Sequence, residues 1–261
     1  MKIINRYRIL IVFVNVVICC TGCASKEQPS WSDSMIGYNH SLSQGAKQET
    51  VISVIDFDEP VTAEDSSTTI SHLELMTSII NNMAPNAKII PKPLNESTAV
   101  ALAEAIDNSV EEDVDIISLS LGISEDHPRL RQSISSAIEK GLLVICAAGN
   151  NYDDLLYPAM YESTISCLAR DIQGRDAYKN FQKITKKSFS APGVHVSING
   201  KRYSGSSIST AIITSQFALA CSISHNKSDI VAHAIATAEN GSKYSYGVIQ
   251  TDALMHVISE T

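Results

Sequence analysis

Glycine and proline are scarce in this chain of 261 residues, at 12 and 8, which excludes a low-complexity protein. Basic residues are also in the minority, with 20 lysines and arginines against 28 aspartates and glutamates. The resulting charge of −8 does not provide the basic surface that nucleic-acid binding requires, so we expect no nucleic-acid partner. No repeat of about 20 to 50 residues is visible. The hydrophobic share of 44% is enough for the core of one sizeable globular domain or two small ones.

Cysteine is too sparse for a disulfide framework. Only Cys146, Cys167 and Cys221 follow residue 23, and each lies inside an apolar run. An odd number placed in this way is typical of buried thiols in a core. Since no Cys-x-x-Cys spacing with a second pair of ligands follows residue 23, we expect no metal.

The N-terminus has the pattern of a secretory signal. Basic residues at positions 2, 6 and 8 precede an apolar run over residues 9–20, which is too short to span a bilayer comfortably. The following Cys20-Thr21-Gly22-Cys23 resembles a bacterial lipobox, in which Cys23 is lipidated and becomes the first residue. Cys20 departs from that pattern, because leucine is usual there. An ordinary signal peptide and an uncleaved anchor are the alternatives.

This pattern predicts three regions of the chain. Residues 1–22 form a lipoprotein-type signal peptide, residues 23–47 a tether and N-terminal arm, and residues 48–261 the folded domain. Loss of the signal removes three basic and no acidic residues, so the formal charge falls from −8 to −11. Membrane attachment would therefore come from a lipid on Cys23 rather than from charge. We expect a lipid-anchored monomer on the extracytoplasmic side of a bacterial cell membrane.

From residue 48 onward, apolar strands alternate with amphipathic helices. Strands are predicted at residues 51–55, 88–90, 114–121, 142–147 and 164–168, and helices at 71–83, 97–108, 130–140, 207–223, 228–239 and 252–258. Residues 57–70 are polar and turn-rich, and Asn199-Gly200 indicates a small hairpin. This alternation predicts an α/β domain with a mostly parallel sheet.

Polar residues gather where the predicted strands end. Asp56, the segment 120–122 and Asn150 each follow an apolar strand, and ligands bind at such ends in parallel sheets. Ser207 lies in a Gly/Ser turn that leads into a buried helix, where backbone N–H groups and the helix dipole favour an anion. By itself this serine is better explained as part of a helix cap, because Ser and Thr are common at helix starts.

Seven motifs in this order resemble those of the subtilisin-like serine peptidases. They lie at residues 54–56, 71–87, 116–122, 144–150, 157–161, 191–194 and 205–209, and so extend over about residues 48–258. The resemblance implies a three-layer fold with helices on both faces of the sheet. It also implies an endopeptidase that cleaves an exported peptide or protein, with no cofactor.

The resemblance implies specific roles for residues of this chain. Asp56, His72 and Ser207 take the places of the catalytic triad, with Ser207 as nucleophile, His72 as general base and Asp56 orienting the imidazole. Asn150 takes the place of the oxyanion-hole residue. The substrate-binding positions correspond to Ser120, Leu121, Gly122, Ala148 and Gly149. The acids Asp153 and Asp154, next to them, suggest a preference for basic residues near the cleavage point.

Three departures from the family pattern bear on activity. The small residue and glycine that usually follow the aspartate are Phe57 and Asp58, and the glycine after the histidine is Leu73. Asp58 adds a negative charge near the triad, and Leu73 is bulky at a tight contact. A catalytically inactive relative that binds a peptide or a partner is therefore the alternative to an active endopeptidase.

Overall fold

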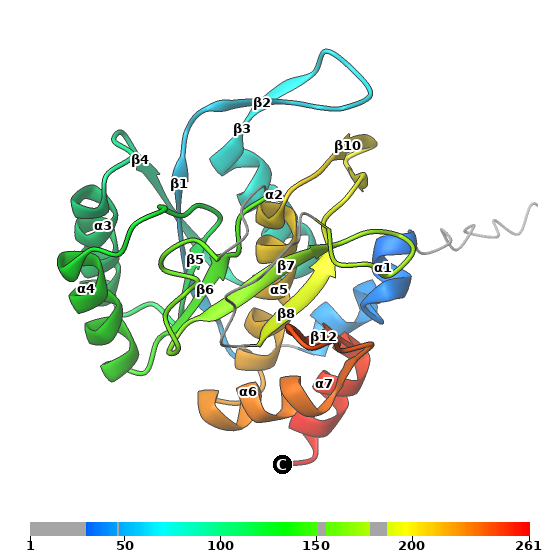
Figure 1. The fold of residues 1–261 in the computed structure, drawn as a ribbon. Helices are drawn as coiled ribbons and strands as arrows, with labels where there is room; N and C mark the ends of the chain where they lie inside the picture. Colours follow the sequence, from blue (N-terminus) through cyan, green and yellow to red (C-terminus); the bar gives the residue numbers. More distant parts are fainter. Residues whose placement is uncertain (1–29, 46, 151–154, 178–186) are drawn as a thin grey trace, which may run out of the picture.

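An eight-stranded, mostly parallel sheet forms the centre of the molecule (Figure 1). The computed structural model describes residues 30–45, 47–150, 155–177 and 187–261. In sheet order the strands are β11 (Ala238–Glu239), β12 (Ser245–Ile249), β8 (Ser188–Pro192), β7 (Ile165–Arg170), β6 (Leu143–Ala147), β5 (Ile116–Leu119), β1 (Val51–Phe57) and β4 (Lys88–Leu94). Only the β11–β12 pair of this sheet is antiparallel. The predicted fold class is therefore confirmed.

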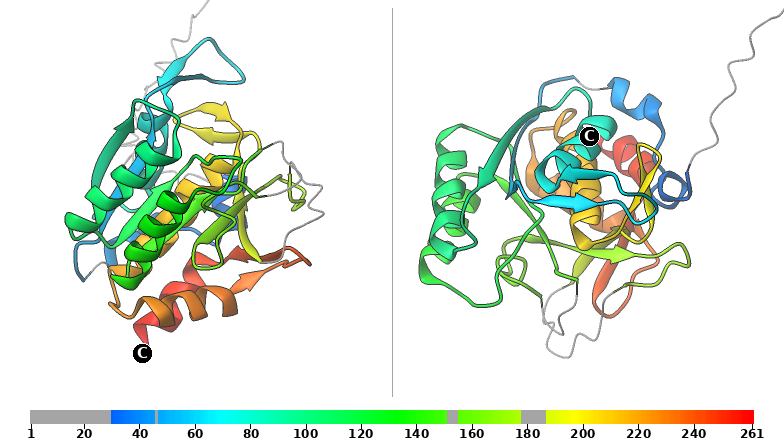
Figure 2. Two further views of the ribbon diagram at one scale, coloured as in Figure 1. Left: turned by 60° about the vertical axis from the view of Figure 1, so that its left-hand side comes forward. Right: turned by 90° about the horizontal axis from the view of Figure 1, so that it is seen from above.

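Helices cover both faces of the sheet (Figures 1 and 2). One face packs against α3 (Ala99–Glu111) and α4 (Pro128–Glu139); the other packs against α2 (His72–Met83), α5 (Ser206–Cys221), α6 (Lys227–Ala236) and α7 (Thr251–Ser259). Strand residues alternate between the two cores as the pleat requires, so Val54 faces the core with α5 while Ile55 faces the core with α3. None of the helices in the described ranges is long and apolar enough to cross a bilayer.

Helix α5 runs through the larger core. Every one of its 16 residues except Ser207 is buried. A helix that is apolar and buried all round belongs inside a protein, and its polar residues need internal partners. Thr214 meets this need by hydrogen bonding to Ser118 of β5, with 2.9 Å between the hydroxyl oxygens. The three cysteines predicted as core thiols are also buried, and burial raises the pKa of Cys221 to about 12.

The edge strand β4 is longer than the sequence predicts. The predicted strand ends at residue 90, yet Pro91 and Pro93 pair in register with β1, opposite Val54 and Asp56. Proline is tolerated here because β4 is an edge strand, with no further strand beside it among the described residues.

Two small hairpins lie above the carboxyl ends of the strands (Figure 1). The expected turn at Asn199-Gly200 joins β9 (Val196–Ile198) to β10 (Lys201–Tyr203), with φ of +50° and +74° at the two turn residues, as a two-residue hairpin requires. The segment predicted as polar loop contains a second hairpin, β2 (Pro60–Thr62) and β3 (Thr69–Ser71). Strand β12 is not among the predicted strands, and it passes through Gly247, which has φ of +119° at a register irregularity. The helix predicted over 228–239 ends earlier, at Ala236, and residues 238–239 form β11 instead.

The described part of the N-terminal arm packs onto the domain. It consists of α1 (Trp31–Met35), a following buried residue Ile36 that is 1% exposed, and a 3₁₀ helix, η1 (His40–Gly45). The carbonyl oxygen of Ile36 accepts hydrogen bonds from both the N–H and the hydroxyl of Thr251, each 2.7 Å long. The arm is thereby fixed to the start of α7. Residue 23 lies outside the described residues.

Candidate active site

Asp56 and His72 form a close pair. Asp56 is the second-last residue of β1, and His72 is the first residue of α2. The side chain of Asp56 is 1% exposed and that of His72 is 21% exposed. Asp56 Oδ2 lies 2.8 Å from His72 Nδ1, and Asp56 Oδ1 accepts the N–H of Phe57 at 2.8 Å. An ionised Asp56 places the imidazole proton on Nδ1, which leaves Nε2 as the basic nitrogen.

The residues after Asp56 hold the start of α2. The hydroxyl of Ser71, the N-cap, accepts the N–H of Glu74 at 3.3 Å and donates to Asp58 Oδ1. The N–H of His72 donates to the carbonyl oxygen of Glu59 at 2.8 Å. Among the described contacts, Ser71 and Glu74 form only half of a capping box, since the Glu74 side chain makes no bond back to the N–H of Ser71. Asp58 therefore helps to fix the helix turn that carries His72.

The other two departures from the family pattern, Leu73 and Phe57, pack into the apolar clusters of the domain. Leu73 is 7% exposed and belongs to the same apolar cluster as α5. Phe57 is half-buried and packs on the opposite face of the sheet, with the cluster that contains α3 and α4. Neither side chain belongs to the set that lines the pocket between His72 and Ser207. Their bulk is accommodated inside the fold.

We expect Ser71→Ala to lower the free energy of unfolding by about 1 kcal/mol, because it removes the cap of α2 and the partner of Asp58. Urea denaturation followed by circular dichroism measures this effect. Asp58→Asn is the matched control, since the amide oxygen keeps an acceptor for Ser71, and we expect a smaller loss. An unfolding midpoint for Ser71→Ala equal to that of the unmutated chain would contradict this role of the cap.

Ser207 is held at the start of α5 by its neighbours. Gly205, the N-cap residue, has φ of +151°, a conformation that favours glycine. The Ser207 hydroxyl donates to the carbonyl oxygen of Ser120 at 3.2 Å, and the Ser120 hydroxyl donates to the carbonyl oxygen of Ser207 at 3.3 Å. Among the described contacts, the Ser207 hydroxyl makes this bond and none to His72. His72 and Ser207 nevertheless line the same pocket, of about 270 Å³.

Asn150 lies beside the nucleophile position. Its Oδ1 accepts the N–H of Ser206 at 2.7 Å, which commits the oxygen to the protein and leaves Nδ2 as the donor. A Cβ atom placed on Gly205 would lie 3.4 Å from Asn150 Nδ2 and 3.8 Å from the Ser207 nitrogen. The missing side chain of Gly205 thus leaves a space bordered by two N–H donors, the arrangement that an oxyanion requires.

The predicted substrate-binding residues differ in their surroundings. In the described chain, the backbone of Leu121 and Gly122 makes no hydrogen bond, so a peptide can add beside it. By contrast, the N–H of Ala148 donates to Cys167, and its carbonyl oxygen accepts from Leu156. The remaining positions, Ser120 and Gly149, contact the start of α5: Ser120 as above, and Gly149 through its N–H to the Ser206 hydroxyl at 3.2 Å. Residues 153 and 154 lie outside the described residues.

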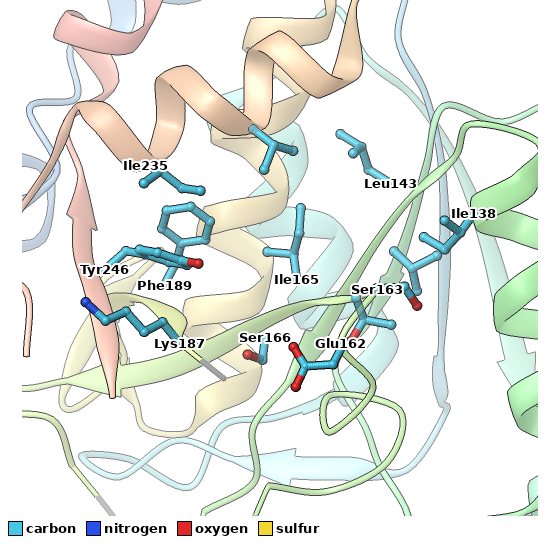
Figure 3. A pocket seen from close by; sticks show the side chains of 13 residues that line it. Ile138, Leu143, Glu162, Ser163, Ile165, Ser166, Lys187, Phe189, Ile235 and Tyr246 are labelled. Atoms are coloured by element: carbon cyan, nitrogen blue, oxygen red, sulfur yellow. The ribbon is translucent and has the colours of Figure 1, made fainter. Parts of the chain in front are cut away.

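Two further pockets lie away from these residues. One, of about 200 Å³, opens between α4 and α6, and Figure 3 shows its apolar floor with Glu162 and Lys187 among its polar side chains. The other, of about 430 Å³, lies between the N-terminal arm, α2 and the β9–β10 hairpin. Neither includes a residue that the sequence predicts for the site. The described residues contain no group of three His, Cys, Asp or Glu side chains that could hold a metal ion.

The sequence interpretation missed Glu64. This residue lies in the turn of the β2–β3 hairpin and lines the pocket that contains His72 and Ser207. The available signal was a pair of short β-branched runs, 61–62 and 68–70, separated by five residues. Strands this short are stabilised by their tertiary contacts, so such a signal is weak.

The chain matches known proteases in sequence. The model of the Subtilase family matches residues 61–248, a range that contains His72, Asn150 and Ser207 and begins after Asp56. The "Major intracellular serine protease" of Bacillus subtilis (strain 168) is 30% identical over 168 residues, covering 59% of this chain and 50% of the relative. The "Thermophilic serine proteinase" of Bacillus sp. (strain AK1) is 32% identical over 187 residues, covering 66% of this chain and 46% of the relative. The chain spans about half the length of the curated relatives it matches.

Solved structures show the same architecture. The patellamide maturation protease PatG superimposes with a TM-score of 0.72 at 18% identity, covering 89% of this chain and 99% of that chain. A lanthipeptide protease superimposes with a TM-score of 0.69 at 14% identity, covering 87% of this chain and 94% of that chain. At such identities the likeness shows the fold alone.

Proposed function

The chain belongs to the subtilase family, and from that premise we propose that it is a serine endopeptidase that hydrolyses peptide bonds of an exported peptide or protein. One observation carries the proposal: the His72 side chain is bound to buried Asp56 at 2.8 Å and shares a pocket with Ser207, the only residue of α5 that is not buried. A base and a nucleophile are thereby presented to the same space.

The proposed reaction begins at Ser207. Its hydroxyl turns from Ser120 towards His72 Nε2, which takes the proton as the oxygen attacks the substrate carbonyl carbon. Asp56 stabilises the imidazolium that forms. The carbonyl oxygen becomes an oxyanion and accepts hydrogen bonds from Asn150 Nδ2 and the Ser207 N–H.

The tetrahedral intermediate then collapses. The carbon–nitrogen bond breaks, and His72 gives its proton to the leaving amine, which leaves an ester between the acyl group and Ser207. Water attacks this ester with His72 again as base, releasing the carboxylic acid and restoring the serine. Each triad member returns to its starting protonation state.

The second candidate function is a catalytically inactive relative that binds a peptide. One contact favours it: the Ser207 hydroxyl donates to Ser120 rather than to His72. Cleavage of casein and of quenched fluorescent peptides by the purified full-length chain separates the two functions. We expect cleavage that a fluorophosphonate inhibits, whereas peptide binding without cleavage would contradict the endopeptidase.

We further propose that Cys23 carries a lipid that holds the enzyme on the extracytoplasmic face of the membrane. The lipobox-like residues 20–23 support this. After expression in an exporting bacterial host, the unmutated chain should enter the detergent phase, and Cys23→Ala should remain in the aqueous phase. Cys19→Ala is the control, since it lies outside the four-residue motif and should still enter the detergent phase. Aqueous partitioning of the unmutated chain would contradict lipidation.

A further inference from the structure

Glu64 lies in the pocket between the nucleophile and the base. The lining of this pocket of about 270 Å³ includes Glu64, His72 and Ser207, together with the apolar side chains of Val61, Leu75 and Ile208. Among the described residues that line it, Glu64 is the one carboxylate. The remaining lining is apolar or neutral, so the carboxylate determines which charge the pocket accepts.

Contacts with the β9–β10 hairpin fix this carboxylate in place. Glu64 Oε2 lies 2.5 Å from His195 Nδ1, and Oε1 accepts a hydrogen bond from the Ser204 hydroxyl. The N–H of Glu64 donates to the carbonyl oxygen of Arg202 at 2.8 Å. Next to it, Asp65 Oδ2 pairs with Arg202 Nε at 3.3 Å. The two hairpins therefore form one wall of the pocket, and Glu64 is positioned before any substrate arrives.

The carboxylate is partly shielded from solvent and is ionised. The Glu64 side chain is 31% exposed, while that of His195 is 67% exposed. Burial alone would raise the pKa of Glu64, but hydrogen bonds from Ser204 and His195 outweigh it and hold that pKa below its usual value. Each carboxylate oxygen has a second lone pair, so Glu64 can accept a further donor while these bonds persist.

The lining of the pocket relates it to one side of the scissile bond. None of the substrate-binding positions 120–122, 148 and 149 lines it. In the proposed reaction the acyl part of the substrate adds beside residues 120–122, whereas this pocket is lined by Ser207 and His72 but by none of those residues. This arrangement leaves the pocket for the part of the substrate that departs as the amine.

We propose that Glu64 is a specificity-determining residue that selects a lysine or arginine in the first or second position after the scissile bond. This inference rests on the proposed endopeptidase function. A cationic side chain with a long aliphatic stem fits the lining, because the stem packs on Val61, Leu75 and Ile208 while the cation reaches Glu64. The charged hydrogen bond forms at a partly shielded site, where it is stronger than at an open surface.

Peptide cleavage by the unmutated full-length chain tests the inference first. A peptide library is digested and the cleavage sites are read by mass spectrometry. We expect lysine and arginine to be enriched in the first or second position after the cleaved bond. For one such peptide, kcat/KM should exceed that of its Lys→Met counterpart by about tenfold. Equal values of kcat/KM for the two peptides would overturn the assignment.

Variants then locate the effect. Glu64→Gln keeps a hydrogen-bond acceptor but removes the charge, so the Lys/Met ratio should fall to about 1; Glu64→Lys should favour an acidic residue at the same position. Asp65→Asn is the control, because Asp65 pairs with Arg202 and does not line the pocket. If Glu64→Gln keeps the ratio, or if Asp65→Asn abolishes it, the assignment to Glu64 is wrong.

A separate readout distinguishes this inference from the proposed function. A fluorophosphonate reacts with an activated serine without a leaving peptide. If the unmutated chain is labelled at Ser207 but shows no preference for basic residues, only the role of Glu64 fails. If the unmutated chain is neither labelled nor able to cleave peptides, the endopeptidase proposal fails and the Glu64 inference fails with it.

Discussion

Ser207→Ala is expected to lower kcat for peptide hydrolysis by about 10⁴ to 10⁶-fold while KM changes little. The reason is that the hydroxyl forms the bond to the acyl group, whereas the backbone and neighbouring loops bind the substrate. His72→Ala should cost a similar factor, and the double variant should be hardly worse than either single variant, because the two groups act as a unit. Steady-state kinetics on one fluorescent peptide measures all three.

Ser209→Ala is the matched control for Ser207→Ala. Its hydroxyl also lies in the first turns of α5, but it donates to the carbonyl oxygens of Ala191 and Pro192 at 2.9 and 3.1 Å. We expect Ser209→Ala to lower stability and to leave kcat within about tenfold. A Ser207→Ala variant that keeps more than a hundredth of the activity would contradict the role of Ser207 as nucleophile.

Asn150→Ala is expected to lower kcat by about 10² to 10³-fold, which corresponds to a loss of about 3 to 4 kcal/mol of transition-state stabilisation. The amide donates to the oxyanion only after the carbonyl carbon becomes tetrahedral, so KM should change little. The measurement is the ratio of kcat values for variant and unmutated chain under saturating peptide.

Asn150→Asp separates this donor role from a structural one. A carboxylate keeps an acceptor for the N–H of Ser206, which Asn150 Oδ1 binds at 2.7 Å, but offers no donor to an oxyanion. We expect Asn150→Asp to be at least as inactive as Asn150→Ala while unfolding at a higher urea concentration. Activity near that of the unmutated chain in Asn150→Asp would show that Asn150 acts only by holding Ser206.

Much of the fold could be predicted from local patterns. The buried strand β6 is a continuous apolar run and β5 is interrupted only by Ser118, and such runs between helices with a 3.6-residue period indicate a parallel sheet. The glycine at 141 follows α4 with φ of +79°, where its N–H and that of Leu142 bond back to Ile138 and Ala137, so the predicted end of this helix is confirmed. These signals depend only on residues close in sequence.

Elements that depend on distant contacts could not be predicted in this way. The β2–β3 hairpin has short, exposed strands, and its turn is held through Glu64 and Asp65 by residues more than 130 positions later. The extent of β4 depends on its place at the sheet edge, which the sequence around Pro91 and Pro93 does not show. For the same reason the sequence around His195 does not indicate its partner, Glu64, which lies close to it only in the folded chain.

In the candidate site, too, the residues could be predicted from local motifs, whereas contacts between distant residues could not. Asp56, His72, Asn150 and Ser207 were predicted from ordered motifs, and the structure brings the first two into contact and the last two to the start of α5. The consequence of Asp58 could not be predicted, because the sequence shows an added charge but not its hydrogen bond to Ser71. Through that hydrogen bond Asp58, although it departs from the family pattern, helps to hold the helix turn that carries His72.

Reaction of the folded full-length chain with a fluorophosphonate, followed by peptide mapping in a mass spectrometer, tests whether this triad works. Only a serine hydroxyl with a competent base and oxyanion donors is phosphonylated rapidly. We predict one adduct, on the peptide that contains Ser207, and its loss in Ser207→Ala. A chain that shows native circular dichroism and a cooperative unfolding transition, yet carries no adduct or carries it on another serine, would contradict the proposed endopeptidase.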